Sequence, residues 1–303
     1  MFLGIDCLID PRGVPFISEV NIGLPGGIFE YGLIEKYIYK RDSNIFELIE
    51  EISLQKHGKS FASYIQKSPY FSLHQKFKIW MDREGNLPDL LAPIFRLEDK
   101  WNQYLLLKKN FRMPYTEIFS GNFNQLLKLS KKYGKIALKR RCGRWSKGFK
   151  VFDENFSKED FNEIKEDDYI CQQYIESKID NYIFSVRINT FAGKFLCLTG
   201  DLTPSYKSVW RYIVAIEEGK NQKIEKANFD ILDILEPAWE SKIWCKGEIP
   251  EHMKLNLTHD KLALTKVFLK KETISEMKEM AIGIANLYEK IDLSQLPPAF
   301  FEK

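Results

Sequence analysis

The first residues of the chain carry the pattern that most constrains its fold. Apolar and branched side chains run from Phe2 to Ile9, Asp10 to Gly13 reads DPRG, and the apolar pattern resumes from Val14 to Val20. A turn composition between two such runs predicts a β-hairpin. Because side chains alternate along a strand, the hairpin places Asp6, Glu19 and Asn21 on one face.

Two carboxylates and an amide oxygen on one face are hard ligands of the kind that Mg²⁺ prefers. The alternative is the solvent-exposed polar face of an amphipathic hairpin. Asp and Asn are poor strand formers, so a face that collects both carries a propensity cost that a solvated surface does not need. From these residues alone both interpretations stay open.

The rest of the chain predicts a mixture of helices and strands without internal repeats. Helices are expected within 29–68, over Glu98–Asn110 and over Phe123–Tyr133, with Gly134 as a C-terminal cap. Thr273-x-x-Glu276 predicts a capping box that opens a last helix with one apolar face. Strands are expected over Phe77–Trp80, Lys135–Lys139, Phe149–Phe152, Asp168–Gln173, Tyr182–Phe191 and Lys194–Thr199. The stretch from about 207 to 272 shows no readable pattern.

Composition narrows the function classes. With 44% hydrophobic and 29% charged residues, the 303-residue chain has the profile of a globular protein. It has no apolar run of about eighteen residues and no signal-peptide pattern, so we expect a cytoplasmic protein without a membrane partner. The five cysteines are scattered without a CxxC pair, which argues against disulfides and zinc.

A basic run extends from Lys128 to Lys150, with ten basic and no acidic residues. It could be a solvated face, a nucleic-acid patch or an anion-binding site. Within it, Cys142 follows Arg141, which could lower its pKa, although an unreactive loop cysteine is the simpler interpretation.

The hairpin residues also carry a family resemblance. Asp6-(x)12-Glu19-x-Asn21, in the sequence GIDCLIDPRGVPFISEVN, resembles the metal-binding motif of the ATP-grasp superfamily. The resemblance implies that Asp6 and Glu19 ligate Mg²⁺ and that Asn21 is a third ligand. Pro25-Gly26 resembles the family's loop after the Asn.

Two later segments resemble the elements that hold nucleotide phosphates. LEDKWNQYLLLKKNFRMPYTEIF resembles the family's opening element, in which Lys100 matches a phosphate-side lysine. KIALKRRCGRWSKGFKVF resembles the next strand and phosphate-covering loop, with Lys139 as the second lysine and Gly143 to Gly148 as the loop. Glycine-containing loops allow close approach of backbone N–H groups to phosphates.

A third segment, DYICQQYIESKIDNYIFSVRIN, resembles the hinge that holds adenine. The resemblance implies that backbone groups around Gln173 and Tyr174 bind adenine and that Asp180 binds the ribose. Gln173 replaces the Glu that is common at this position. Arg187 matches a strand arginine that approaches phosphate or substrate and is the candidate catalytic residue.

In this chain the metal hairpin precedes the nucleotide segments, the reverse of the usual order. The resemblance therefore implies an α+β ATP-grasp fold with two lobes clasping the nucleotide, circularly permuted like relatives of glutathionylspermidine synthase. The expected division is a metal-binding hairpin at 1–29 that completes the C-terminal lobe, a helical or mixed substrate-side region at 30–97, a nucleotide-binding lobe at 98–170, and a C-terminal lobe at 171–303.

The implied function is an ATP- and Mg²⁺-dependent ligase that joins a carboxylate to an amine or thiol through an acylphosphate. Its partners would be small-molecule or peptide-like carboxylates and amines. The alternatives are a kinase acting on a small-molecule hydroxyl and a non-catalytic nucleotide-binding protein, with a nucleic-acid binder less favoured. The specific substrates and the oligomeric state stay open.

Overall fold

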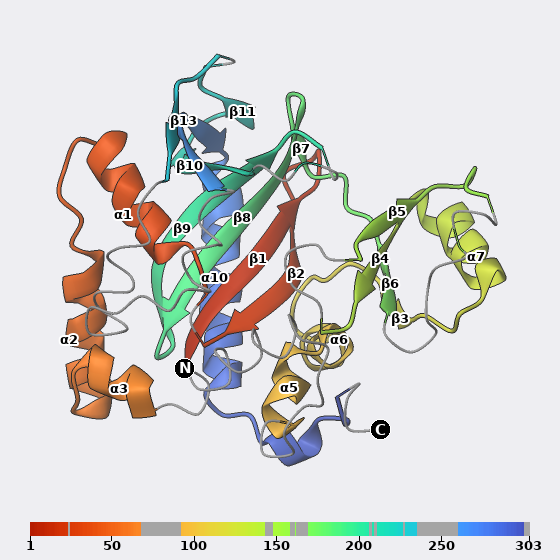
Figure 1. Ribbon diagram of the computed structural model, residues 1–303, viewed down its shortest axis with the longest axis horizontal. Helices are drawn as coiled ribbons and strands as arrows, with labels where there is room; N and C mark the ends of the chain where they lie inside the picture. Colours follow the sequence, from red (N-terminus) through yellow and green to blue (C-terminus); the bar gives the residue numbers. More distant parts are fainter. Residues whose placement is uncertain are drawn as a thin grey trace. The chain divides into compact units, whose positions relative to one another are not determined.

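A computed structural model describes residues 1–23, 25–67, 92–142, 148–157, 161, 169–205, 208, 211–226, 228–234 and 260–299. They fall into two compact units. The first comprises the described parts of 1–15, 21–76 and 176–290, and the second those of 16–20, 77–175 and 291–303. Helices and strands are both abundant in each unit, so the predicted α+β class is confirmed (Figure 1).

The larger sheet has nine strands within the described residues, in the order β11-β13-β10-β9-β8-β1-β2, with β12 paired to β13 and β7 to β8. Its neighbours run antiparallel, apart from the parallel pair β10 and β13, in the registers that the structure gives. The strands are β1 (Phe2–Ile9), β2 (Pro15–Ile22), β7 (Lys178–Ile179), β8 (Tyr182–Phe191), β9 (Lys194–Thr203), β10 (Arg211–Glu218), β11 (Lys223–Ile224), β12 (Ile231–Asp233) and β13 (Asp260–Leu269).

The predicted N-terminal hairpin is confirmed as β1 and β2. The N–H of Gly13, at φ 88°, donates to the Asp10 carbonyl at 2.9 Å. The Asp10 carboxylate accepts from the N–H groups of Arg12 and Val14, both at 2.9 Å. The turn is therefore closed by local hydrogen bonds that the DPRG composition supplies.

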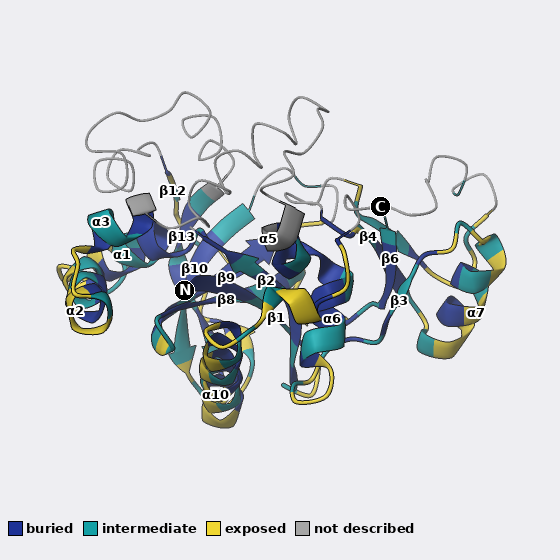
Figure 2. Ribbon diagram, turned by 90° about the horizontal axis from the view of Figure 1, so that it is seen from below, coloured by how far each residue is buried: buried dark blue, intermediate teal, exposed yellow. Residues whose placement is uncertain are grey.

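The first unit contains α1 (Ile28–Tyr37), α2 (Ile45–His57), α3 (Phe61–Lys67) and α10 (Lys271–Tyr288). Figure 2 shows α10 lying along one face of the sheet, against β8, β9 and β1. The expected apolar face of α10 is buried there, at Ile274, Met277, Ala281, Ile284 and Tyr288.

The predicted capping box of α10 is wrong. The helix begins at Lys271 with Lys270 as N-cap, and no side chain caps it. Thr273 Oγ1 instead donates to the Gly13 carbonyl at 2.7 Å, so a tertiary contact with the hairpin turn takes the hydroxyl.

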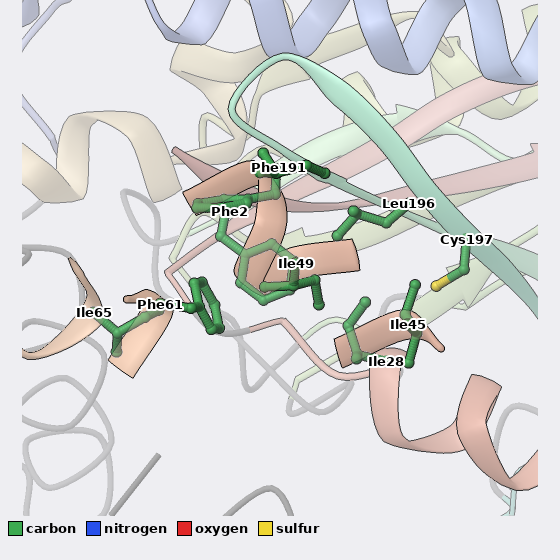
Figure 3. Packing of buried hydrophobic residues seen from close by; sticks show 10 residues of the cluster. Phe2, Ile28, Ile45, Ile49, Phe61, Ile65, Phe191, Leu196 and Cys197 are labelled. Carbon is green, nitrogen blue, oxygen red and sulfur yellow. The ribbon is translucent and has the colours of Figure 1, made fainter. Parts of the chain in front are cut away.

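An aromatic cluster fills the space between α2, α3 and the sheet (Figure 3). The rings of Phe2, Phe61 and Phe191 meet edge to face, with centroids 5.1 to 6.0 Å apart. Aromatic pairs favour this geometry. These ring contacts anchor the start of β1 and the end of β8, the two strands that carry the candidate site.

The second unit is built on an antiparallel sheet in the order β3-β6-β4-β5. Its elements are β3 (Thr116–Ile118), β4 (Ile136–Arg140), β5 (Lys150–Phe152), β6 (Tyr169–Gln173), α5 (Ala92–Glu98), α6 (Lys100–Leu107), α7 (Phe123–Tyr133) and the 3₁₀ helix η4 (Leu293–Gln295). Leu126 and Leu129 of α7 pack on Ile136 and Leu138 of β4 in its core.

The local predictions for the second unit hold, with one correction. Helix α7 and its cap at Gly134, with φ 81°, are confirmed. The helix expected over Glu98–Asn110 is present but shorter, as α6. The side chain of Asp99 accepts from Trp101 N to cap it, so the helix begins after Asp99, and α5, which ends at Glu98, was not predicted. The strand predicted at Phe77–Trp80 lies outside the described residues.

Candidate functional site

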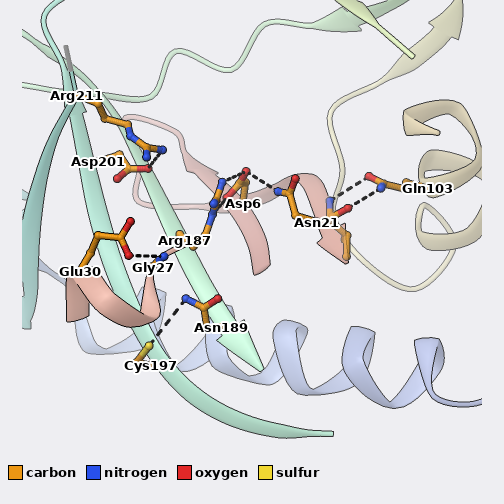
Figure 4. A network of polar contacts seen from close by, with 11 residues as sticks. Asp6, Asn21, Gly27, Glu30, Gln103, Arg187, Asn189, Cys197, Asp201 and Arg211 are labelled. Atoms are coloured by element: carbon orange, nitrogen blue, oxygen red, sulfur yellow. Dashed lines mark hydrogen bonds and ion pairs between the residues drawn. The ribbon is translucent and has the colours of Figure 1, made fainter. Parts of the chain in front are cut away.

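In the first unit, Asp6 and Arg187 form a two-point ion pair. They are register partners on β1 and β8. Arg187 Nε donates to Asp6 Oδ1 at 2.6 Å and Nη2 donates to Oδ2 at 2.8 Å (Figure 4). The Arg187 side chain is 18% exposed and the Asp6 side chain is 22% exposed, so solvent reaches the pair. A planar guanidinium matches a carboxylate in this fork geometry.

The stem of Arg187 is held in place by the loop after β2. A Cβ on Gly27, at φ 111°, would lie 3.2 Å from Arg187 Cγ and 2.5 Å from Asn189 Nδ2. A Cβ on Gly4 would lie 3.3 Å from Arg187 Cδ and 2.4 Å from Pro25 Cβ. Only glycine permits this close approach, which fixes the direction of the guanidinium.

The pKa of Arg187 is raised. Burial acts to lower it, but the charge and hydrogen bonds of Asp6 outweigh burial, with a smaller contribution from Asp201. Arg187 therefore stays cationic at any physiological pH.

Asn21 completes this set, because its Nδ2 donates to Asp6 Oδ2 at 3.2 Å. The structure thus brings together Asp6, Asn21 and Arg187, all singled out from the sequence. Glu19 and Asn21 are two residues apart in β2, both half-buried between buried neighbours. They therefore project to the same side of that strand.

In the second unit, Glu19 contacts Lys100. Lys100 Nζ lies 3.2 Å from Glu19 Oε1, with 7% of the lysine side chain and 21% of the glutamate side chain exposed. Lys139 Nζ donates to Ser18 Oγ at 3.0 Å. Both predicted phosphate-side lysines thus reach consecutive residues of β2.

A buried ion pair sets the position of Lys100. Arg141 Nη2 and Nε donate to the Asp99 carboxylate at 2.6 and 3.1 Å. The backbone N–H of Lys100 donates to the Arg141 carbonyl at 2.9 Å. This pair was not predicted from the sequence. Asp99 and Arg141 lie 42 residues apart, so no local pattern joins them.

Only part of the predicted phosphate loop, Gly143 to Gly148, lies among the described residues. Gly143 lies outside the described residues. Gly148 has φ 74°, and a Cβ there would lie 2.9 Å from Tyr169 Oη and 3.2 Å from Arg140 Cγ. Close packing therefore explains the glycine at 148, and its approach to phosphate stays a prediction.

The predicted adenine hinge has its amide donors occupied. Gln173 N–H donates to the Tyr115 carbonyl at 2.7 Å, and Tyr174 N–H donates to the Lys135 carbonyl at 3.0 Å. An adenine contact at these residues would therefore use carbonyl or side-chain groups.

Asp180 occupies a turn in the first unit. It is exposed, has φ 51° and lies in the two-residue turn that joins β7 to β8. Asp tolerates positive φ better than most residues, so the turn by itself accounts for this residue. Its ribose contact stays a prediction.

One further ion pair and one carboxylate–backbone hydrogen bond near Arg187 were not predicted. Arg211 Nη1 donates to Asp201 Oδ2 at 3.2 Å, from β10 to β9. The buried carboxylate of Glu30 accepts from Gly27 N–H at 2.7 Å at the start of α1. Since their segments carry no motif, no local sequence signal identifies them.

Cys142 does not have a lowered pKa. Burial raises its pKa well above the ordinary value, with the charge of Asp99 adding to the effect, and the contribution of Arg141 is smaller. Arg141 turns its guanidinium to Asp99, so the thiol stays protonated and unreactive.

No protein-family model matches the chain, and no curated protein gives a sequence match. In the described part of the chain, no set of three His, Cys, Asp or Glu side chains is arranged to hold a metal. None of the described helices has both the length and the apolar character needed to cross a membrane.

Proposed function

We propose that the protein is a cytoplasmic ATP- and Mg²⁺-dependent ligase with a circularly permuted ATP-grasp fold, which joins a carboxylate to an amine or thiol through an acylphosphate. The observation that carries this proposal is the Asp6–Arg187 pair with Asn21 on the same carboxylate. Asp6 and Asn21 belong to the hairpin motif and Arg187 to the hinge segment, which the resemblance assigned separately, and both Asn21 and Arg187 contact Asp6.

The residues present fit a Mg²⁺ site and a nucleotide. Asp6, Asn21 and Glu19 offer only hard oxygen ligands, and Mg²⁺ binds through one or two carboxylates and completes its shell with water and phosphate. Each carboxylate contacts a side-chain cation, Arg187 for Asp6 and Lys100 for Glu19, and a metal would compete with these cations for the carboxylate oxygens.

In this proposal the protein positions reactants and compensates charge. When bound, ATP supplies the phosphoryl group and Mg²⁺ neutralises part of its charge. Lys100 and Lys139 hold phosphate oxygens, and Arg187, fixed by Asp6 and the glycine loop, points a guanidinium at developing negative charge. Positioning and electrostatic stabilisation of this kind account for most catalysis of phosphoryl transfer.

Nucleotide-dependent stabilisation tests the proposal. At about 100 times its dissociation constant, a ligand stabilises the folded state by roughly 2.7 kcal/mol, which raises the thermal midpoint by several degrees for a protein of this size. We expect such a shift with Mg·ATP, smaller shifts with GTP, and loss of the shift in Lys139→Ala. Lys128→Ala, on the exposed face of α7, is the matched control and keeps it. A wild-type protein that no nucleotide stabilises would rule out the proposal.

Product analysis then separates the reaction types. A ligase releases inorganic phosphate when a carboxylate and an amine are both present, whereas a kinase leaves the phosphoryl group on the acceptor. Glu19→Gln should abolish Mg²⁺-dependent turnover and keep the fold, monitored by circular dichroism. Full turnover in that variant would remove Glu19 from the site.

A further inference from the structure

We infer that Lys100 blocks the metal-ligating carboxylate of Glu19 until a nucleotide phosphate draws the lysine away, so that Mg²⁺ and nucleotide bind cooperatively. The inference rests on the proposed function for the identity of both ligands. Its structural basis is the contact of 3.2 Å between Lys100 Nζ and Glu19 Oε1.

The contact lies in a partly desolvated place. Only 7% of the Lys100 side chain and 21% of the Glu19 side chain is exposed. An ammonium this close to the carboxylate repels a divalent cation, and the repulsion is stronger here than in bulk water because the effective dielectric constant is lower. Free Mg²⁺ must therefore displace a bound cation to reach Glu19.

A nucleotide changes this balance. Phosphate oxygens offer the ammonium a partner with more negative charge than one carboxylate, and charge-assisted hydrogen bonds to phosphate are strong. Once Lys100 turns to phosphate, Glu19 becomes available to the metal that arrives with the nucleotide. Because binding coupling is reciprocal, Mg²⁺ raises nucleotide affinity by the same factor.

The first unit holds its own candidate ligand in a similar way. Both oxygens of Asp6 accept from Arg187, and Oδ2 also accepts from Asn21. A basic side chain thus neutralises the carboxylate of Asp6, as Lys100 neutralises that of Glu19. Lys128, on the exposed face of α7, is a lysine of the second unit outside the proposed site and provides the control.

The test is a calorimetric titration of MgCl₂ into nucleotide-free protein at fixed ionic strength. We expect weak binding to the wild type and to Lys128→Met, and about tenfold tighter binding to Lys100→Met, where the repelling charge is gone. Both substitutions remove one positive charge from the second unit, so a difference between them isolates the contact with Glu19. Equal affinity of all three proteins would overturn the inference.

Two further variants keep the test decisive. Lys100→Gln, which keeps a hydrogen-bond donor, replaces Lys100→Met if that variant does not fold. Glu19→Gln in the Lys100→Met background should abolish the gain in affinity, and a gain that persists would place the metal elsewhere and overturn the inference. The Mg·ATP midpoint shift of the wild type reports on the proposed function separately. If Mg·ATP raises the wild-type midpoint but Lys100→Met binds Mg²⁺ no more tightly, the lysine block is wrong and the proposed function stands. If Lys100→Met binds Mg²⁺ more tightly but no nucleotide raises the midpoint, nucleotide binding is wrong, and so is its coupling to Mg²⁺.

Discussion

At the scale of single residues, Arg141 shows how a member of the basic run is used inside the fold. Its guanidinium is 3% exposed and pairs with the fully buried carboxylate of Asp99. Its carbonyl accepts from Lys100 N–H. A charge from a run that could have formed an anion-binding site thus fixes the start of the helix that carries Lys100.

This burial predicts a large effect of substitution. Arg141→Met should lower the free energy of unfolding by about 3–5 kcal/mol, because it leaves the Asp99 charge buried without its partner. Arg12→Met is the matched control, since Arg12 pairs with Asp10 at 2.7 Å but is 78% exposed, and it should change stability by less than about 1 kcal/mol. Urea unfolding of both variants gives the comparison. Similar losses would show that the Arg141 pair is not specially desolvated.

The sequence predicted the contact within the hairpin better than it predicted contacts between distant strands. Asp6 and Asn21 meet as expected, because strand alternation within a hairpin is a local rule. The bond from Arg187 to Asp6 joins residues 181 positions apart, and no local rule reaches that far. For the same reason the ion pair between Asp201 and Arg211 was not predicted, because strands β9 and β10 must pair before the two side chains meet.

At the scale of elements, local chemistry again separates success from failure. The hairpin turn and α7 were predicted because their turn and cap residues act on their own neighbours. The start of α10 was misread because Thr273 serves a distant carbonyl. Strand β13 was missed because it pairs with β10 and two short strands far from it in sequence, a context in which burial overrides intrinsic propensity.

Helix α10 allows the burial pattern to be tested within one element. Ile284 is fully buried, whereas Ile282 is 37% exposed. Ile284→Ala should lower the free energy of unfolding by about 2–5 kcal/mol, through lost burial and a residual cavity. Ile282→Ala, with the same change of helix propensity, should cost less than about 1 kcal/mol. Denaturant midpoints measured side by side decide it, and a reversed order would mean that α10 presents a different face to the sheet.

At the scale of the whole molecule, the basic run is divided among several structural roles. Among its described members, Lys128, Lys131 and Lys132 lie on α7, Lys139 and Arg140 on β4, and Lys150 on β5. Arg141 is buried, Lys139 donates to Ser18, and Lys132 lies over the rings of Tyr115 and Tyr133. This division does not favour a continuous nucleic-acid stripe.

We therefore expect only weak binding to nucleic acid. Fluorescence anisotropy with a labelled duplex and a labelled single strand should give dissociation constants no tighter than about 10⁻⁶ M at physiological salt, the range of non-specific electrostatic binding. Submicromolar binding that falls steeply with salt would instead identify the run as a nucleic-acid surface. The same measurement on Lys128→Ala would then report whether α7 contributes.

The pairing of β1 with β8 also governs when the first unit can form. Phe2 pairs with Phe191, and Asp6 with Arg187, so an N-terminal strand must wait for residues made much later. At a synthesis rate of about 5–20 residues per second, the wait is roughly 10–35 s. During that time the apolar β1, which lies between β2 and β8 in the finished sheet, leaves the ribosome with one edge lacking its partner. The nascent chain would be most prone to aggregation then, and chaperone binding to the N-terminal hairpin would matter most before β8 is made.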